Sequence, residues 1–131
     1  MGQHLRVIES PELGTAVAHY SQGIVAGDFI FLAGQVAFDE NNKLVGEGDV
    51  VAQTKQVIKR MEIALREAGA TLRDVVSATV FLRDLKDFPD FNRAWAEAFG
   101  DHKPARATVQ AQMALPELLV EVQAVAYRGT R

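Results

Sequence analysis

The chain has 131 residues, 48% of them hydrophobic and 24% charged, and a net charge of -3. This length suits one domain with its own core, so we expect a single domain over residues 1–131. Weak acidity without a basic block argues against nucleic acid as a partner. The absence of cysteine excludes disulfides, a thiolate nucleophile and a Cys-ligated metal.

The remaining composition bears on location and cofactors. No apolar run could span a bilayer, so no membrane is expected as a partner, and the first residues lack the apolar core of a signal peptide. We therefore expect a cytoplasmic protein. The three histidines, His4, His19 and His102, are scattered without the spacing of metal ligands, so we expect neither a metal nor another cofactor.

The first third of the chain predicts strands joined by turns. A short strand near Leu5–Ile8 is followed by a strand over 19–26. Gly27-Asp28 then forms a hairpin turn to a return strand over 29–36. Gly34 within that strand indicates a bulge, or a place where another group approaches the backbone closely.

A polar turn over 39–43 leads to a long helix, with Asp49 as its N-cap and Gly69 just past its end. Apolar side chains recur along this helix at helical spacing and predict the face that packs on the core. They are Val50, Thr54, Val57, Met61, Ala64, Leu65 and Ala68.

A second helix follows a further strand. Residues 71–74 form a short capped turn, and residues 75–82, rich in β-branched side chains, form a strand. A helix is expected to follow, because Asp87 can cap its first turn and an early proline is tolerated there. Gly100 ends this helix. Its apolar face carries Phe88, Phe91, Trp95 and Phe99.

Two strands, over 105–112 and 118–127, end the chain around a turn at 115–117. The order of elements predicts an α+β fold, in which two helices cover one face of a mixed β-sheet. The other face is too apolar to be left in water, so we expect an oligomer formed through it. The candidates for this open face are Phe29, Phe31, Val80, Leu82 and Val122.

Pro104 precedes a segment that alternates between small apolar and polar residues. Ala105, Ala107, Val109 and Ala111 lie on one side of the predicted strand, and Arg106, Thr108, Gln110 and Gln112 lie on the other. Arg106 therefore stands at the start of a strand between small neighbours, which suits bidentate capture of a carboxylate. The alternative is a solvated arginine on an outer sheet face.

Several stretches of the chain together resemble the RidA/YjgF/L-PSP family of enamine/imine deaminases. They follow the family's order and cover nearly the whole chain. The resemblance implies a chorismate-mutase-like fold assembled as a homotrimer, with three clefts between subunits. The matching stretches are residues 19–23, 31–36, 48–49 with 53–54, 79–85, 91–92 and 104–109.

The resemblance also implies roles for single residues. Arg106, after Pro-Ala, holds the substrate carboxylate, and the backbone at Gly34 contributes to the same cleft. Tyr20 and Asn92 line it. The alternative for Tyr20 is a half-buried ring with its hydroxyl in water, and the alternative for Asn92 is a surface amide or local cap.

The chain departs from the family at three positions. Many members carry a water-positioning glutamate in the last strand, where this chain has Gln123; an amide can hold a water but cannot accept a proton at neutral pH. Glu121 points the same way, one pleat period along, and could substitute if the cleft extends that far. Thr108 replaces a frequent cysteine, and Ala33 replaces a serine donor of some members.

These features predict hydrolysis of a 2-imino acid of the 2-iminobutanoate or 2-iminopropanoate type, or its enamine, to a 2-keto acid and ammonia. Arg106 would fix the carboxylate and Gln123 would orient the water. The alternative is a module that binds a small carboxylate without converting it. A ribonuclease or translation-inhibitor role lacks support, since the sequence has neither a basic groove nor a histidine pair.

Overall fold

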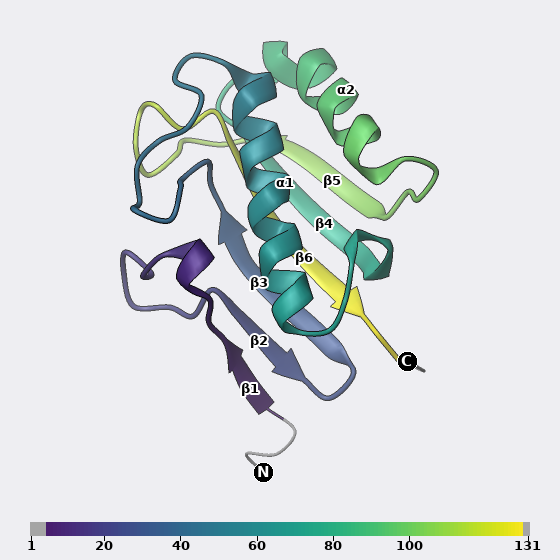
Figure 1. Ribbon diagram of the computed structural model, residues 1–131. Helices are drawn as coiled ribbons and strands as arrows, with labels where there is room; N and C mark the ends of the chain where they lie inside the picture. The colour runs from purple at the N-terminus through teal and green to yellow at the C-terminus, as the bar shows by residue number, and fades with distance from the viewer. Residues whose placement is uncertain (1–4, 130–131) are drawn as a thin grey trace.

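The computed structural model describes residues 5–129, which form one six-stranded sheet with two helices on one face (Figure 1). The helices are α1 (Val50–Glu67) and α2 (Phe88–Phe99). Short 3-10 turns cover 11–13, 72–74 and 85–87. The strands are β1 (Leu5–Ile8), β2 (Gly23–Ala26), β3 (Phe29–Gln35), β4 (Val75–Leu82), β5 (Ala105–Gln110) and β6 (Val120–Tyr127).

The strand order across the sheet is β1-β2-β3-β6-β4-β5. Strand β6, the last in sequence, lies in the middle of the sheet and pairs antiparallel with β3 and β4. The pairing of β4 with β5 is parallel, and α2 provides the crossover that a parallel pair requires. The predicted α+β architecture, a mixed sheet with both helices on one face, is confirmed.

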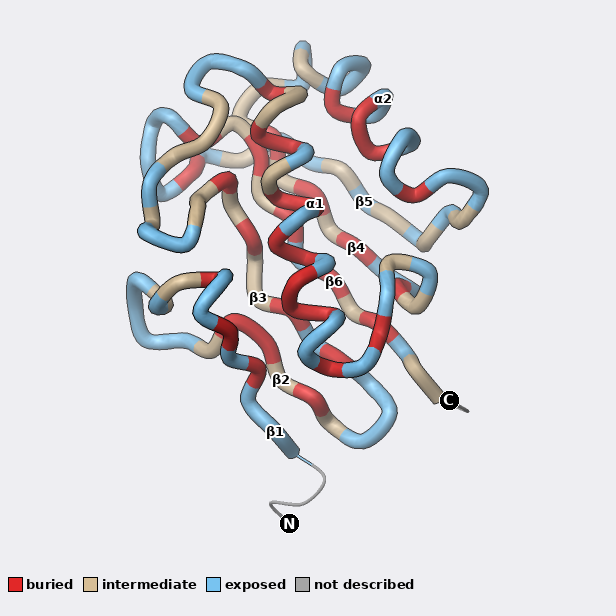
Figure 2. The backbone as a smooth tube through the Cα atoms, in the orientation of Figure 1, coloured by how far each residue is buried: buried red, intermediate tan, exposed pale blue. Residues whose placement is uncertain are grey.

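Helix α1 supplies much of the core, as Figure 2 shows by the buried segments along it. All seven residues of the predicted apolar stripe are buried. The Asp49 carboxylate accepts a hydrogen bond from the Ala52 N–H at 3.0 Å, which makes it the predicted N-cap. Gly69 follows the last turn with φ of 75°, a left-handed conformation that favours glycine.

The predicted cap of α2 is wrong. The Asp87 side chain makes no cap hydrogen bond, because a 3-10 turn over 85–87 leads straight into the helix. The cap of that turn is Asp84, whose carboxylate accepts from the Lys86 N–H at 2.9 Å. On the apolar face of α2, three aromatic residues are buried, whereas Phe88 is 37% exposed.

Four predicted strands are shorter in the structure, and the one predicted over 29–36 ends at Gln35. The strand predicted over 19–26 begins at Gly23, because the chain before it turns, with the Tyr20 N–H bonded to the Ala18 carbonyl at 3.0 Å. The last two strands end at Gln110 and begin at Val120. Residues 111–119, between these two strands, therefore form a loop.

The open face of the sheet was predicted only in part. Phe29 and Phe31 lie on it, 44% and 46% exposed, as expected. The prediction is wrong for Val80, Leu82 and Val122, which are fully buried on the helix side of the sheet. From Ala78 onward in β4, and along all of β6, the even-numbered residues are buried under the helices and the odd-numbered ones face outward. The open face accordingly includes Val109, Val125 and Tyr127.

Replacing the two predicted caps should have unequal effects on stability. Asp49→Ala removes the bond to Ala52 and should lower the free energy of unfolding by about 1 kcal/mol. Asp87→Ala removes no cap bond and should cost about 0.5 kcal/mol or less. Urea denaturation of both variants at one protein concentration measures the difference. Equal losses would contradict the assignment of the caps.

Candidate functional site

Arg106 is held between an amide and three aromatic rings under α2. Its Nη2 donates a hydrogen bond to Asn92 Oδ1 at 2.9 Å. The guanidinium carbon lies 5.7, 5.3 and 5.4 Å from the ring centroids of Phe88, Phe91 and Trp95. Contacts of this kind are favourable cation–π interactions, so the position of the charge is well fixed.

The alternation of β5 is the predicted one, and its polar side faces the helices. Arg106 and Thr108 are half-buried, whereas the small residues Ala105 and Ala107 are exposed on the open face. Burial lowers the pKa of Arg106 from its usual value, although a guanidinium stays protonated at neutral pH. The charge is therefore partly shielded from water and available to an anion.

A hollow of about 410 Å³ lies beside this guanidinium, which we call the Arg106 hollow. Within residues 5–129, no ion pair involves Arg106, and none of the residues around the hollow is acidic. A fixed guanidinium without a carboxylate partner is suited to binding one from a ligand. The other lining residues are Asn92, Trp95, Ala96, Phe99, Gly100, His102, Lys103 and Pro104.

The second group of candidate residues surrounds a bulge in β3. The pairing of β3 with β6 shifts between Leu32 and Gln35, which leaves Ala33 and Gly34 in the irregular stretch. A β-carbon at Gly34 would collide with the Glu121 carboxylate where it lies, so a larger residue would have to displace that side chain. The bulge and the close approach predicted for Gly34 are both confirmed.

Glu121 is half-buried on the open face, two residues before the exposed Gln123 on the same side of β6. Burial raises the pKa of the Glu121 carboxyl above its usual value. Among residues 5–129 it has no hydrogen-bond or ion-pair partner. A carboxyl group with these properties is typical of a general acid or base.

These residues line a hollow of about 800 Å³, which we call the bulge hollow. Tyr20, Ala33, Gly34, Glu121 and Gln123 all contribute to it, so five of the predicted site residues meet here. The remaining lining is mostly apolar: Val17, Ala18, Val36, Phe38, Ala114, Leu115 and Leu118, with Asn42. An apolar wall of this kind limits the hydration of any charge inside it.

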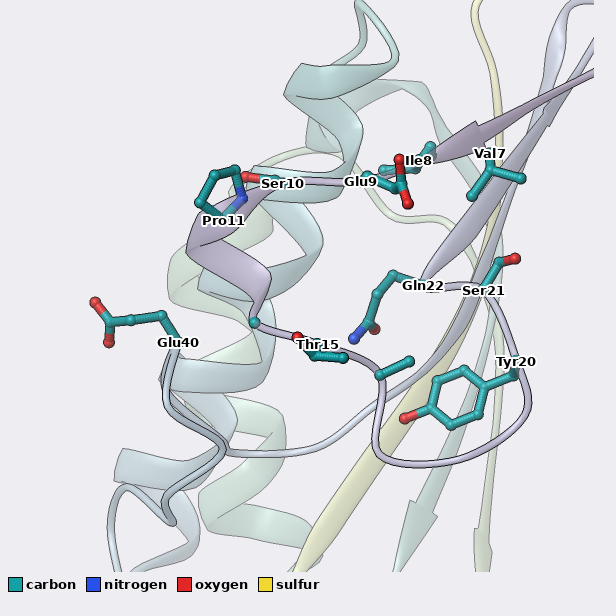
Figure 3. Close-up of a pocket in the computed structure, with 12 residues that line it drawn as sticks. Val7, Ile8, Glu9, Ser10, Pro11, Thr15, Tyr20, Ser21, Gln22 and Glu40 are labelled. Atoms are coloured by element: carbon teal, nitrogen blue, oxygen red, sulfur yellow. The ribbon is translucent and has the colours of Figure 1, made fainter.

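Tyr20 also borders a separate hollow of about 650 Å³ near the N-terminal segment (Figure 3). In the view of Figure 3, the Tyr20 ring and the Gln22 side chain extend toward the segment that carries Thr15. Tyr20 itself is 44% exposed. Its ring is therefore shared between two hollows, and its hydroxyl can reach water.

Within one chain, the two groups of candidate residues lie on opposite faces of the sheet. Arg106 pairs with Ala78 of β4, which is buried under the helices, whereas Glu121 pairs with Phe81. Side chains at even and odd positions of β4 point to opposite faces. Arg106 and Asn92 line the Arg106 hollow, and Thr108 lies on the same face of β5 but outside that lining. We call these residues one half-site and the residues of the bulge hollow the other.

The sequence did not reveal the aromatic enclosure of Arg106. The helical spacing of Phe91 and Trp95 indicated only a core face, because no local pattern shows that α2 packs over β5. The enclosure therefore emerges only from the tertiary structure.

The histidines occupy separate places. His102 Nε2 lies 2.7 Å from the Val75 carbonyl oxygen, and His19 is exposed in the loop before β2. His4 lies outside the described residues. No group of three His, Cys, Asp or Glu within residues 5–129 could hold a metal ion. In the same range, neither helix has the length and apolar character needed to cross a membrane.

Comparison with known proteins agrees with the resemblance seen in the sequence. The family described as Endoribonuclease L-PSP matches residues 10–128. A RutC family protein of Pyrococcus abyssi is 42% identical over 122 residues, which cover 93% of this chain and 96% of the relative. The 3-aminoacrylate deaminase RutC of Acinetobacter baylyi is 37% identical over 111 residues, or 85% and 88% of the two chains.

The fold agrees as well. The crystal structure of Escherichia coli TdcF with bound serine is 26% identical, with a TM-score of 0.87 over 95% of this chain and 99% of that one. The family match, the relatives and the shared mixed sheet all point the same way, and the chain belongs to the Endoribonuclease L-PSP family, which includes the RidA, YjgF and RutC proteins.

Proposed function

We propose that this chain is an enamine/imine deaminase, which hydrolyses small 2-imino acids of the 2-iminobutanoate type to 2-keto acids and ammonia. The observation that carries the proposal is Arg106, a fixed guanidinium beside a hollow without acidic residues. Two relatives support the chemistry and the ligand class: one is named a 3-aminoacrylate deaminase, and another was crystallised with serine. Both ligands are small carboxylates that carry nitrogen.

The proposal includes an assembly, since the two half-sites face away from each other in one chain. The open face carries exposed aromatic residues, among them Phe29, Phe31 and Tyr127. Burying such a face against another copy is favourable. Because β5 is an edge strand, the bulge hollow of the next copy would meet the Arg106 hollow at this edge of the sheet. A homotrimer with three shared clefts is the assembly that we propose.

In this cleft the Arg106 guanidinium binds the substrate carboxylate. A charge-assisted pair of this kind contributes about 1.5–3 kcal/mol. The imine carbon then lies over the Ala33–Gly34 bulge, near the Glu121 carboxylate. Holding the imine and the water in attacking geometry supplies much of the acceleration, because a protonated imine is already electrophilic.

Water attacks the imine carbon and gives a proton to Glu121. The resulting carbinolamine takes the proton back on nitrogen and expels ammonia, while its hydroxyl proton returns to solvent and the carbonyl of the keto acid forms. We assign the proton transfer to Glu121 because it is half-buried, has a raised pKa and touches Gly34. Gln123, an exposed amide, is left as a hydrogen-bond partner of the same water.

Arg106→Ala should lower kcat/KM by about 100-fold or more, since both the binding energy and the orientation of the carboxylate are lost. Imino acids made in situ by an amino-acid oxidase, with semicarbazide as a competing trap, provide the assay. Arg93→Ala is the matched control, because Arg93 is exposed on α2 and pairs only with Asp90. Equal activity of the two variants would refute the role of Arg106, and binding of a keto acid without wild-type turnover would indicate a binding module.

A site shared between copies should show complementation. Arg106→Ala and Glu121→Gln subunits are each expected to be inactive as pure oligomers. When equal amounts are unfolded, mixed and refolded together, about a quarter of the clefts should combine an intact Arg106 with an intact Glu121. Activity of the mixture near that fraction of wild type is the expected result. No recovery in mixed oligomers of normal size would contradict the shared cleft.

Glu121 should also leave a signature in the pH dependence of stability. Its pKa is raised in the folded chain above the ordinary 4.5, so the carboxyl favours folding below its unfolded pKa, and this contribution is lost as the pH rises through the folded pKa. Glu121→Gln should therefore melt at a higher temperature than wild type near neutral pH, with the gap closing toward about pH 4. The exposed Glu97→Gln serves as the control. A gap that grows toward acid would contradict the raised pKa.

A further inference from the structure

Arg60, in the middle of α1, is the one charged side chain among the buried residues of the range 5–129, at 3% exposure. It forms no ion pair with any residue in that range. Burying a cation without a carboxylate costs several kcal/mol unless its donors are well hydrogen-bonded. The hydrogen-bond partners of Arg60 therefore decide how this charge is stabilised and which segments it holds.

The Arg60 donors reach three different segments. Nε donates to Gln35 Oε1 at 2.9 Å, Nη1 to the Phe38 carbonyl at 3.1 Å, and Nη2 to the Leu13 carbonyl at 3.0 Å. Burial lowers the pKa of Arg60, but the guanidinium remains charged at neutral pH. One side chain of α1 therefore fixes the end of β3 and the loops on either side of the bulge hollow.

Gln35 extends the contacts to the bulge itself. Its Nε2 donates to Gln22 Oε1 at 3.2 Å and to the Ala33 carbonyl at 3.3 Å. The Ala33 N–H donates to the Gln22 carbonyl at 2.9 Å. Both peptide groups of Ala33 are thus bound, directly before Gly34.

We propose that Arg60 is a positioning residue of the deaminase site, which acts through Gln35 to hold the Ala33–Gly34 bulge against the Glu121 carboxylate. Its effect on turnover rests on the proposed function, whereas its effect on the bulge does not. Gln35 pairs with the buried Val122, so the contacts approach β3 from the helix side. The strand is fixed from behind, and the bulge hollow on the open face stays free for a ligand.

The double variant Arg60→Met/Gln35→Leu tests this role. The two side chains lose their mutual bond together, but the Leu13 and Phe38 carbonyls and Gln22 Oε1 each lose a donor, so the variant should melt below wild type and is compared with it at a temperature where both are folded. The bulge should then relax, and Glu121 should gain water. We expect its pKa, followed by ¹³C NMR of the side-chain carboxyl, to fall toward the ordinary value, and kcat to drop about 10-fold or more with a smaller change in KM.

The titration reports on Glu121 alone because its surroundings hold few titratable groups. Within one chain, Tyr20 is the other titratable side chain that lines the bulge hollow, and the residues of β3 and β4 that face Glu121 are uncharged. In the proposed trimer, Arg106 of the next copy also faces the cleft, but its charge is the same in wild type and in every variant compared. Thr54→Val is the matched control: Thr54 is fully buried in α1 and donates to the Val50 carbonyl at 2.7 Å, outside this network. It should leave the Glu121 pKa and kcat unchanged.

A folded double variant with unchanged Glu121 pKa and unchanged kcat would overturn the proposal and leave Arg60 a purely structural residue. If the double variant does not fold, Gln35→Met keeps Arg60, removes the link from Arg60 to Ala33 together with the bond to Gln22, and is expected to shift the same two readouts in the same directions. If wild type shows no turnover, the deaminase proposal fails by itself, and the Glu121 pKa of the variants still decides whether Arg60 positions the bulge.

Discussion

The alternation of side chains along the central strands is the constraint on which the candidate site depends. Because β4 lies between β5 and β6, a residue of β5 and a residue of β6 share a face only when both pair with the same parity of β4. Arg106 pairs with an even position and Glu121 with an odd one. No side-chain rotation can bring them together through the sheet, so a cleft that uses both requires a second copy.

The elements that sequence alone predicted best are those whose signals are local. The hairpin at Gly27-Asp28, the cap at Asp49 and the left-handed Gly69 each depend on a few neighbouring residues. Asp84 and Asp87, by contrast, are equally good caps in sequence. Only the packing of α2 decides where the preceding turn begins, and therefore which of the two carboxylates finds free N–H groups.

The assignment of residues to the two faces of the sheet shows what a local sequence pattern cannot predict. Alternation in β4 gave two sets of residues but did not show which set packs under the helices, because that is decided by long-range pairing. Val80 and Leu82 were therefore placed on the wrong face. The same limit applies to the candidate site. One glycine inside a strand was enough to predict the bulge at Gly34. The rings around Arg106 belong to α2, which contacts β5 only in the folded chain, so the sequence pattern did not predict them.

The charged side chains of the candidate site differ from the buried Arg60, whose donor nitrogens are all hydrogen-bonded. Arg106 and Glu121 lack partners of opposite charge within residues 5–129, and they lie on the two surfaces that the proposed trimer brings together. Arg60, deep in the core, has all three of its contacts satisfied by neutral acceptors. In the proposed mechanism, a bulge fixed from the core side keeps water away from the Glu121 carboxyl, and this exclusion of water preserves the raised pKa that suits it to act as a base.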